Sequence, residues 1–224
     1  MNRKGTFLYQ FGKSFAVPIF RILFPSWENN PERVPENGPL IICCNHVCMK
    51  DPIYLTFSPK RQIFYMAKKE LFENKFVGKV LRALGAFAIE RGAGDKESLS
   101  AAEKILKDGG ALGIFIEGTR SKDGKLGRPK SGAVMLAYQH HVPILPACIT
   151  TATGGPPKQF ERVILSFGEL IQPEELGIVE GTGSEFRQAS RMVMDRIAEM
   201  RERDEKMFPL PKKRPKKSKA LRKG

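Results

Sequence analysis

Long apolar runs, cysteines in paired spacing and a secretory signal are all missing from this chain of 224 residues. In the apolar N-terminal region Lys13 and Arg21 enclose only seven uncharged residues, whereas a membrane-spanning helix needs about 20. The same region lacks a small-residue cleavage site. The four cysteines do not have the spacing of a zinc site or a disulfide framework. We therefore expect a reduced protein that faces the cytosol and does not cross the membrane.

The chain has a large excess of basic over acidic residues. The net charge is +14, and residues 212–224 carry eight of these charges with no acid, which leaves +6 on residues 1–211. A polybasic segment binds anionic lipid or nucleic acid, or stays solvated. No base-reading or stacking motif accompanies this one, so nucleic acid is not the expected partner. We predict a basic disordered tail over residues 207–224, which either binds an anionic partner or stays solvated.

Apolar side chains recur at helical spacing between Phe7 and Trp27, where Pro18 should kink or split a helix. This pattern predicts an amphipathic helix or helix pair within residues 1–30 that lies on the membrane without crossing it. A helix packed on the protein core is the alternative.

A second amphipathic stretch runs from Lys68 to Leu84 and mixes apolar with basic residues. Its basic members are Lys69, Lys75, Lys79 and Arg82. We expect most of its apolar residues to face the core. Those residues are Leu71, Phe72, Phe76, Val77, Val80, Leu81 and Leu84.

Short apolar runs bounded by turn residues alternate with helical patterns in residues 31–206, which at this length form one domain. The predicted strands are Pro39–Cys44, Gln62–Ala67, Gly85–Ile89, Ala111–Ile116, Val142–Thr150 and Val163–Phe167. One helix should open at Asp51, as N-cap, with Pro52 at its first position. The other predicted helices are Asp95–Asp108, Pro129–His140 and Ser184–Lys206. The alternation predicts an α/β fold with a mixed, largely parallel sheet flanked by helices.

Polar residues follow several of these strands. His46, Glu117 and Arg120 each lie just past a predicted strand end, where α/β sheets bind ligands. Arg91 lies just past another. His46 and Asp51 are five residues apart, so they cannot align on one helix, but a loop histidine can meet an aspartate at a helix start. Histidine with an orienting aspartate is a general base, and arginine beside a glycine turn suits an anionic substrate.

Four sequence blocks occur in a fixed order. They are Asn45-His46-x4-Asp51, Gly85-x5-Arg91, Phe115-Ile116-Glu117-Gly118-Thr119-Arg120-Ser121 and Val142-Pro143-Ile144-Leu145-Pro146. Their order resembles the glycerolipid acyltransferase family, specifically the 1-acyl-glycerol-3-phosphate (lysophosphatidate) acyltransferases, from about Gly38 to Gly168. Ile116 stands where the family usually has proline, and Cys48 where it often has serine. Neither departure removes a proton-transfer or charge-binding group.

The resemblance implies transfer of a fatty acyl group from acyl-CoA or acyl-carrier protein to lysophosphatidate, giving phosphatidate for phospholipid synthesis. In this reading His46 is the base and Asp51 orients it, while Arg91 and Arg120 hold the acceptor phosphate. The expected substrate-binding residues are Asn45, Lys68, Arg91, Glu117, Gly118, Thr119, Arg120 and Pro146. No cofactor or metal is expected. Because the acceptor is a membrane lipid, the resemblance implies an anionic membrane surface as the partner of the basic tail, with the enzyme peripherally on the cytoplasmic face of the membrane.

Three alternatives stay open. The acceptor can be glycerol 3-phosphate or another lysolipid. The acyl group can pass through a covalent thioester on Cys48, since thiolates are strong nucleophiles. More remotely, the chain can be a non-enzymatic nucleic-acid-binding protein that uses its basic tail.

Overall fold

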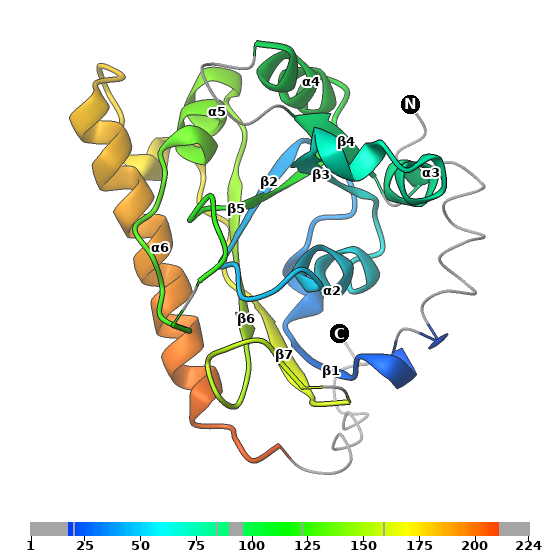
Figure 1. Cartoon of the computed structure of the whole chain (residues 1–224). Helices are drawn as coiled ribbons and strands as arrows, with labels where there is room; N and C mark the ends of the chain where they lie inside the picture. The colour runs from blue at the N-terminus through cyan, green and yellow to red at the C-terminus, as the bar shows by residue number, and fades with distance from the viewer. Residues whose placement is uncertain are drawn as a thin grey trace, which may run out of the picture.

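A seven-stranded sheet forms the centre of the molecule, with helices on both faces (Figure 1). The computed structural model describes residues 18–19, 21–83, 85–89, 96–121, 123–158 and 160–210. The strands are β1 (Ser26–Asn29), β2 (Leu40–Cys44), β3 (Ile63–Lys68), β4 (Ala86–Ile89), β5 (Ala111–Phe115), β6 (Ile144–Thr150) and β7 (Val163–Phe167). Their order is β1-β7-β6-β2-β5-β3-β4, and every pairing is parallel except that of β6 with β7. The predicted mixed, largely parallel α/β fold is confirmed.

The helices cover the two faces of the sheet unequally. They are α2 (Asp51–Phe57), α3 (Lys75–Ala83), α4 (Lys96–Lys107), α5 (Gly132–His140) and α6 (Gly183–Glu205), with short 3-10 turns η1 (Pro31–Arg33), η2 (Lys69–Phe72) and η3 (Pro173–Leu176). One buried cluster joins the sheet to α4, α5 and α6, and the other joins it to α2. Strand β2 is buried on both faces, as its unbroken apolar sequence requires.

Predicted and observed elements agree closely, and the clearest shift is at α5. This helix begins at Gly132, three residues later than predicted. The N–H of Lys130 donates to the carbonyl of Ile116 at 2.8 Å, which ties the segment before the helix to the loop after β5. Lys130 therefore belongs to the loop segment that precedes the helix.

The prediction of a helical segment within residues 1–30 was wrong at the C-terminal end of that range, because Ser26–Asn29 form strand β1 instead. This strand pairs in parallel with β7, and Trp27 stands opposite Ile164. The few described residues before it, 18–19 and 21–23, are helical and exposed. Residues 1–17 and 211–224, which hold most of that segment and most of the predicted tail, lie outside the described residues. The first residues of the tail, 207–210, are described, and the N–H of Met207 donates to the carbonyl of Asp204 at 3.0 Å. Within the described part of the chain, no helix is long and apolar enough to cross a membrane.

The prediction for the stretch Lys68 to Leu84 was also wrong in part, because Leu71, Phe76 and Val77 are exposed. Among the α3 residues whose burial is described, Gly78 is the buried one. A Cβ built there would lie 3.0 Å from the carbonyl oxygen of Phe72, so α3 packs closely on the backbone of η2.

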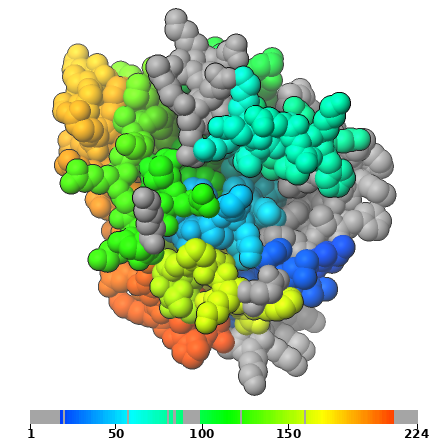
Figure 2. Space-filling view, viewed as in Figure 1, coloured from blue at the N-terminus to red at the C-terminus, as the bar shows by residue number. Residues whose placement is uncertain are grey.

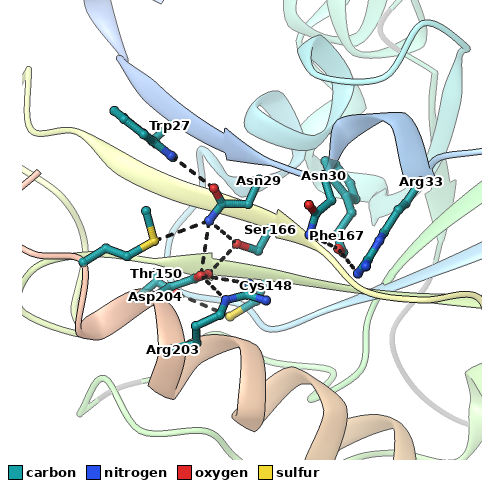
Figure 3. A network of polar contacts seen from close by, with 11 residues as sticks. Trp27, Asn29, Asn30, Arg33, Cys148, Thr150, Ser166, Phe167, Arg203 and Asp204 are labelled. Atoms are coloured by element: carbon teal, nitrogen blue, oxygen red, sulfur yellow. Dashed lines mark hydrogen bonds and ion pairs between the residues drawn. The ribbon is translucent and has the colours of Figure 1, made fainter. Parts of the chain in front are cut away.

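A buried polar network fixes the end of α6 to the sheet (Figure 3). Asp204 is fully buried and accepts hydrogen bonds from the hydroxyl of Ser166 on β7 at 2.5 Å and from the amide of Asn29 on β1 at 3.3 Å. The guanidinium of Arg203 lies 3.0 Å from the same carboxylate. This network therefore joins β1, β7 and the last turn of α6 through one carboxylate.

Replacing Asp204 with alanine is expected to lower the free energy of unfolding by about 3 kcal/mol, because buried donors on Ser166 and Asn29 lose their acceptor. Urea denaturation followed by circular dichroism measures this. Glu202→Ala is the matched control, since Glu202 is an exposed acid on the same helix. Equal effects of the two substitutions would show that the network contributes no stability.

Candidate active site

His46 and Asp51 meet across the loop between β2 and α2. Nδ1 of His46 lies 2.8 Å from Oδ2 of Asp51, with the Asp51 side chain fully buried and that of His46 15% exposed. Nδ1 donates to the carboxylate, so Nε2 of the neutral ring is the nitrogen free to accept a proton. The pair has the geometry of a general base with its orienting acid.

Asp51 is held by the loop that precedes it. Its Oδ2 accepts from the backbone N–H groups of Val47 at 2.6 Å and Cys48 at 2.8 Å. The predicted N-cap role was wrong: α2 begins at Asp51 itself, Lys50 is the N-cap, and the carboxylate turns back to the loop instead of forward to the helix. The carboxylate therefore fixes the backbone around His46 as well as its ring.

Phe115, the last residue of β5, packs on the imidazole. The two rings are stacked with centroids 4.0 Å apart and planes 17° from parallel. Phe115 pairs in register with Cys44, and the histidine loop begins directly after that residue. Sequence reasoning assigned Phe115 no role; its position at the end of a strand next to β2 is a result of strand order, which the sequence did not reveal.

Glu117 joins the loops after β2 and β5. Its Oε1 accepts from the backbone N–H of His46 at 2.9 Å, and its Oε2 from the N–H of Gly127 at 2.8 Å. The carbonyl of His46 in turn accepts from the N–H of Ser121 at 2.8 Å. The backbone of His46 is thus bonded on both sides to the segment that contains the third sequence block.

Asn45 performs a similar function between β2 and β6. Its side-chain amide donates to the carbonyl of Ile149 at 2.9 Å and accepts from the N–H of Ile149 at 2.8 Å, and the residue is buried. The side chains of Asn45 and Glu117 therefore contact backbone in this structure. Their predicted contact with substrate stays a prediction.

Of the other predicted residues, Lys68 and the loop from Gly118 to Arg120 lie at the same edge of the sheet, whereas Pro146 does not. Gly118, Thr119 and Arg120 are exposed on the loop that bonds His46. Lys68 is exposed at the carboxyl end of β3. Pro146 lies inside β6, in register with Cys43, with its carbonyl accepting from Gly168 at 2.8 Å. Arg91 lies outside the described residues.

Lys130 is a cation near this site that sequence reasoning missed. A Cβ built on Gly118, which has a φ of +73°, would lie 3.4 Å from Cγ of Lys130. The stem of Lys130 thus passes beside the glycine turn of the third block. Nothing in the local sequence indicated this, because the two residues come together only through the bond from Lys130 to Ile116.

The thiol of Cys48 is an unsuitable nucleophile. It donates a hydrogen bond to Oδ1 of Asp51 at 3.1 Å. Burial and the neighbouring Asp51 carboxylate raise the pKa of Cys48 to about 12, so the thiol stays protonated near neutral pH. Burial also raises the pKa of Cys43 and of Cys148 to about 12, and that of Cys44 well above its usual range. The covalent alternative thus has no support from the geometry.

Cys48→Ser is expected to keep near-parental acyl transfer, because a serine hydroxyl can donate to Asp51 in the same way. Steady-state rates and mass spectrometry of the protein during turnover measure the result. Complete loss of transfer, or an acyl adduct on Cys48 in the parent, would contradict it.

Comparisons with known proteins identify the family. Residues 28–150 match the family model described as Acyltransferase. Two relatives named 1-acyl-sn-glycerol-3-phosphate acyltransferase are similar to this chain. The Bacillus subtilis protein is 38% identical over 128 residues, which are 56% of this chain and 63% of that protein. The Streptococcus pneumoniae protein is 30% identical over 163 residues, which are 70% of this chain and 60% of that protein. The chain therefore covers less than two thirds of the length of either relative.

A solved structure shows the same fold. The crystal structure of the 1-acyl-sn-glycerophosphate (LPA) acyltransferase, PlsC, from Thermotoga maritima has a TM-score of 0.66 and 24% identity, and the match covers 88% of this chain and 78% of that one. The family match includes β2, β5 and most of the site built on them, from Asn45 to Arg120. On the matched sequence, which is more than half of its length, this chain belongs to the acyltransferase family.

Proposed function

We propose that the chain is a 1-acyl-sn-glycerol-3-phosphate O-acyltransferase. It would move a fatty acyl group from a thioester, acyl-CoA or acyl-carrier protein, to the free hydroxyl of lysophosphatidate, giving phosphatidate for phospholipid synthesis. The observation that carries the proposal is the His46–Asp51 pair, 2.8 Å apart, with Nε2 free to take a proton. The names of the relatives support the acceptor.

His46 acts as the general base. As the acceptor oxygen attacks the thioester carbonyl, Nε2 takes the hydroxyl proton, and a tetrahedral intermediate forms. The carbon–sulfur bond then breaks, and the imidazolium returns the proton to the departing thiolate. Asp51 stabilises the imidazolium and keeps the ring in orientation, while the stacked Phe115 limits its rotation.

The acceptor phosphate needs cations beside the base. Arg120 is exposed one residue from Ser121, whose N–H binds the carbonyl of His46. A guanidinium matches phosphate oxygens with two parallel hydrogen bonds. Lys68 supplies a second charge at the end of β3, and Arg91 has the same role by its place in the second block.

The bilayer holds the acceptor, so the protein acts at a membrane surface. Peripheral binding at the cytoplasmic face would use the basic excess of the chain, with the N-terminal segment and the residues 212–224 as attachments.

A matrix of donors and acceptors tests the proposal with the purified full chain. Acyl-CoA and acyl-carrier protein are each offered with lysophosphatidate, glycerol 3-phosphate and lysophosphatidylcholine, and the products are identified by mass spectrometry. Phosphatidate should form from lysophosphatidate and should not depend on added nucleic acid. No ester product with any acceptor would overturn the proposal, and preference for glycerol 3-phosphate would overturn its acceptor.

Arg120→Ala is expected to raise the KM for lysophosphatidate about tenfold or more, with a much smaller change in the KM for the acyl donor, because the proposed contact of the guanidinium is with the phosphate of the acceptor. Initial rates with each substrate varied in turn measure both constants. Arg196→Ala is a control at an exposed arginine of α6. Equal increases for both substrates would contradict a phosphate-binding role.

A further inference from the structure

An apolar face of α3 lies uncovered beside basic side chains. Phe76 is 77% exposed, and Val77 of α3 and Leu71 of η2 are exposed as well. We propose that η2 and α3 form a bilayer-contact surface that places these side chains among anionic lipids at the edge of the sheet that carries the site. This inference rests on the proposed function, because the bilayer is where that function finds its acceptor.

The contacts described for this helix do not use the side chains of Phe76 and Val77. Asn74 caps it, with Oδ1 accepting from the N–H groups of Phe76 at 3.0 Å and Val77 at 3.1 Å. Gly78 packs against the backbone of Phe72, and the guanidinium of Arg82 lies 5.2 Å from the centre of the Phe72 ring. The exposed aromatic side chain of Phe76 is therefore available to an outside partner.

The charges around this face match an anionic bilayer. Four basic residues lie in η2 and α3, against two acidic residues in the same segment. The basic residues are Lys69, Lys75, Lys79 and Arg82, and the acidic ones are Glu70 and Glu73. An interfacial helix with an apolar face flanked by lysine and arginine binds through apolar burial together with attraction to anionic headgroups. Lysine stems can extend along such a surface to reach those headgroups.

The sheet topology places this surface at the edge that holds the site. Strand β3 leads directly into η2, and it pairs in parallel with β5, whose carboxyl end leads to Glu117. In Figure 2 the light blue surface near residue 50 lies between the teal surface of α3 and the green surface of the segment after β5.

Two other connections at this edge also expose large apolar side chains. Met49, in the loop after β2, is 66% exposed, and Phe160, in the connection that follows β6, is 61% exposed. Exposed apolar groups on three separate connections of one edge favour a broad apolar partner over a single protruding ligand. A lipid bilayer provides such a partner for all three together.

Vesicle binding tests the inference with the full chain. Phe76→Ser combined with Val77→Ser should reduce the partition constant for vesicles of phosphatidylglycerol and phosphatidylcholine in equal parts about tenfold. Val179→Ser is the matched control, because Val179 is 76% exposed on the loop after η3, and its binding should stay within about twofold of the parent. Parental binding by the double variant would overturn the inference.

Charge substitution tests the electrostatic part. Lys75→Gln combined with Lys79→Gln should weaken binding to the same vesicles and reduce its dependence on salt, with little change toward pure phosphatidylcholine, because only headgroup attraction is screened. An unchanged salt dependence would count against contact between this helix and the headgroups.

Other occupants of the surface give different results. If another part of the chain covers it, the double serine variant loses thermal stability and keeps parental vesicle binding. If a second copy covers it, the variant changes its oligomeric state in size-exclusion chromatography without a change in vesicle binding. Either result overturns the inference.

A soluble acceptor separates this inference from the proposed function. With a short-chain, monomeric lysophosphatidate the double serine variant should turn over at the parental rate, whereas with acceptor in vesicles it should be several-fold slower. A parent that acylates neither acceptor refutes the proposed function whatever the vesicles show. A parent active on both, with a variant equally active on both, refutes only the bilayer-contact surface.

Discussion

Acyl transfer by the His46→Ala variant is expected to fall about 10³-fold or more, with the fold unchanged, because the attacking hydroxyl then has no base. His46 is partly exposed and its side chain contributes one hydrogen bond and one stacking contact, so the loss should be in kcat and not in stability. Single-turnover rates and thermal unfolding, measured on the same preparation, check both parts. A variant with more than a tenth of the parental rate would remove His46 from the reaction.

Of the two substitutions in the His46–Asp51 pair, Asp51→Asn is the more specific test. An asparagine oxygen can replace Oδ2 and keep the bonds from His46, Val47 and Cys48, so the substitution removes the charge while largely preserving the geometry. A loss of about 10²-fold in kcat is expected, because the imidazolium formed in the transition state loses its counter-charge. Near-parental activity would show that Asp51 acts on the loop alone.

The second large effect is expected at Glu117, which acts on His46 through the backbone and touches no reacting atom in this structure. Glu117→Gln replaces one carboxylate oxygen with an amide donor, and this donor must then face the N–H of either His46 or Gly127. The resulting displacement of the histidine loop should lower kcat about 10- to 100-fold.

Gly127→Ala tests the same contact from the other side. A Cβ at Gly127 would lie 2.8 Å from Oε2 of Glu117, so the carboxylate has to move. Gly132→Ala is the matched control, since a Cβ there meets no atom within 4 Å. The Gly127 variant should lose kcat with little change in KM, and the Gly132 variant should keep both. Loss in both glycine variants alike would point to general destabilisation and against a positioning role for Glu117.

Much of the fold could be predicted from the sequence because the inner strands are short apolar runs between turn residues. β7 was predicted to the residue and β2 within one. β1 was missed because Ser26–Asn29 contains three polar residues and follows an apolar helical pattern, so nothing local identifies it as a strand. Its pairing with β7 joins residues about 137 positions apart, which no local pattern reports.

The sequence predicted which residues form the site, but not how these residues contact one another. The sequence placed His46 and Glu117 just past strand ends and Asp51 at a helix start, and the strand ends lie at one edge of the sheet. The bond of Glu117 to the backbone of His46 spans 71 residues and depends on the loop conformation, so sequence reasoning assigned Glu117 to substrate instead. Amphipathic spacing likewise revealed that α3 has an apolar face, but not that Gly78 would be buried.

The four buried cysteines make the folded chain inert toward thiol reagents. Their sulfurs are enclosed by the protein and have pKa values raised by burial, so alkylation requires the core to open first. The rate of alkylation at a fixed reagent concentration therefore measures how often each part of the core opens. Cys48 lies in the histidine loop and Cys148 inside β6, so mass spectrometry of the two modified peptides would compare the opening of the histidine loop with that of the sheet.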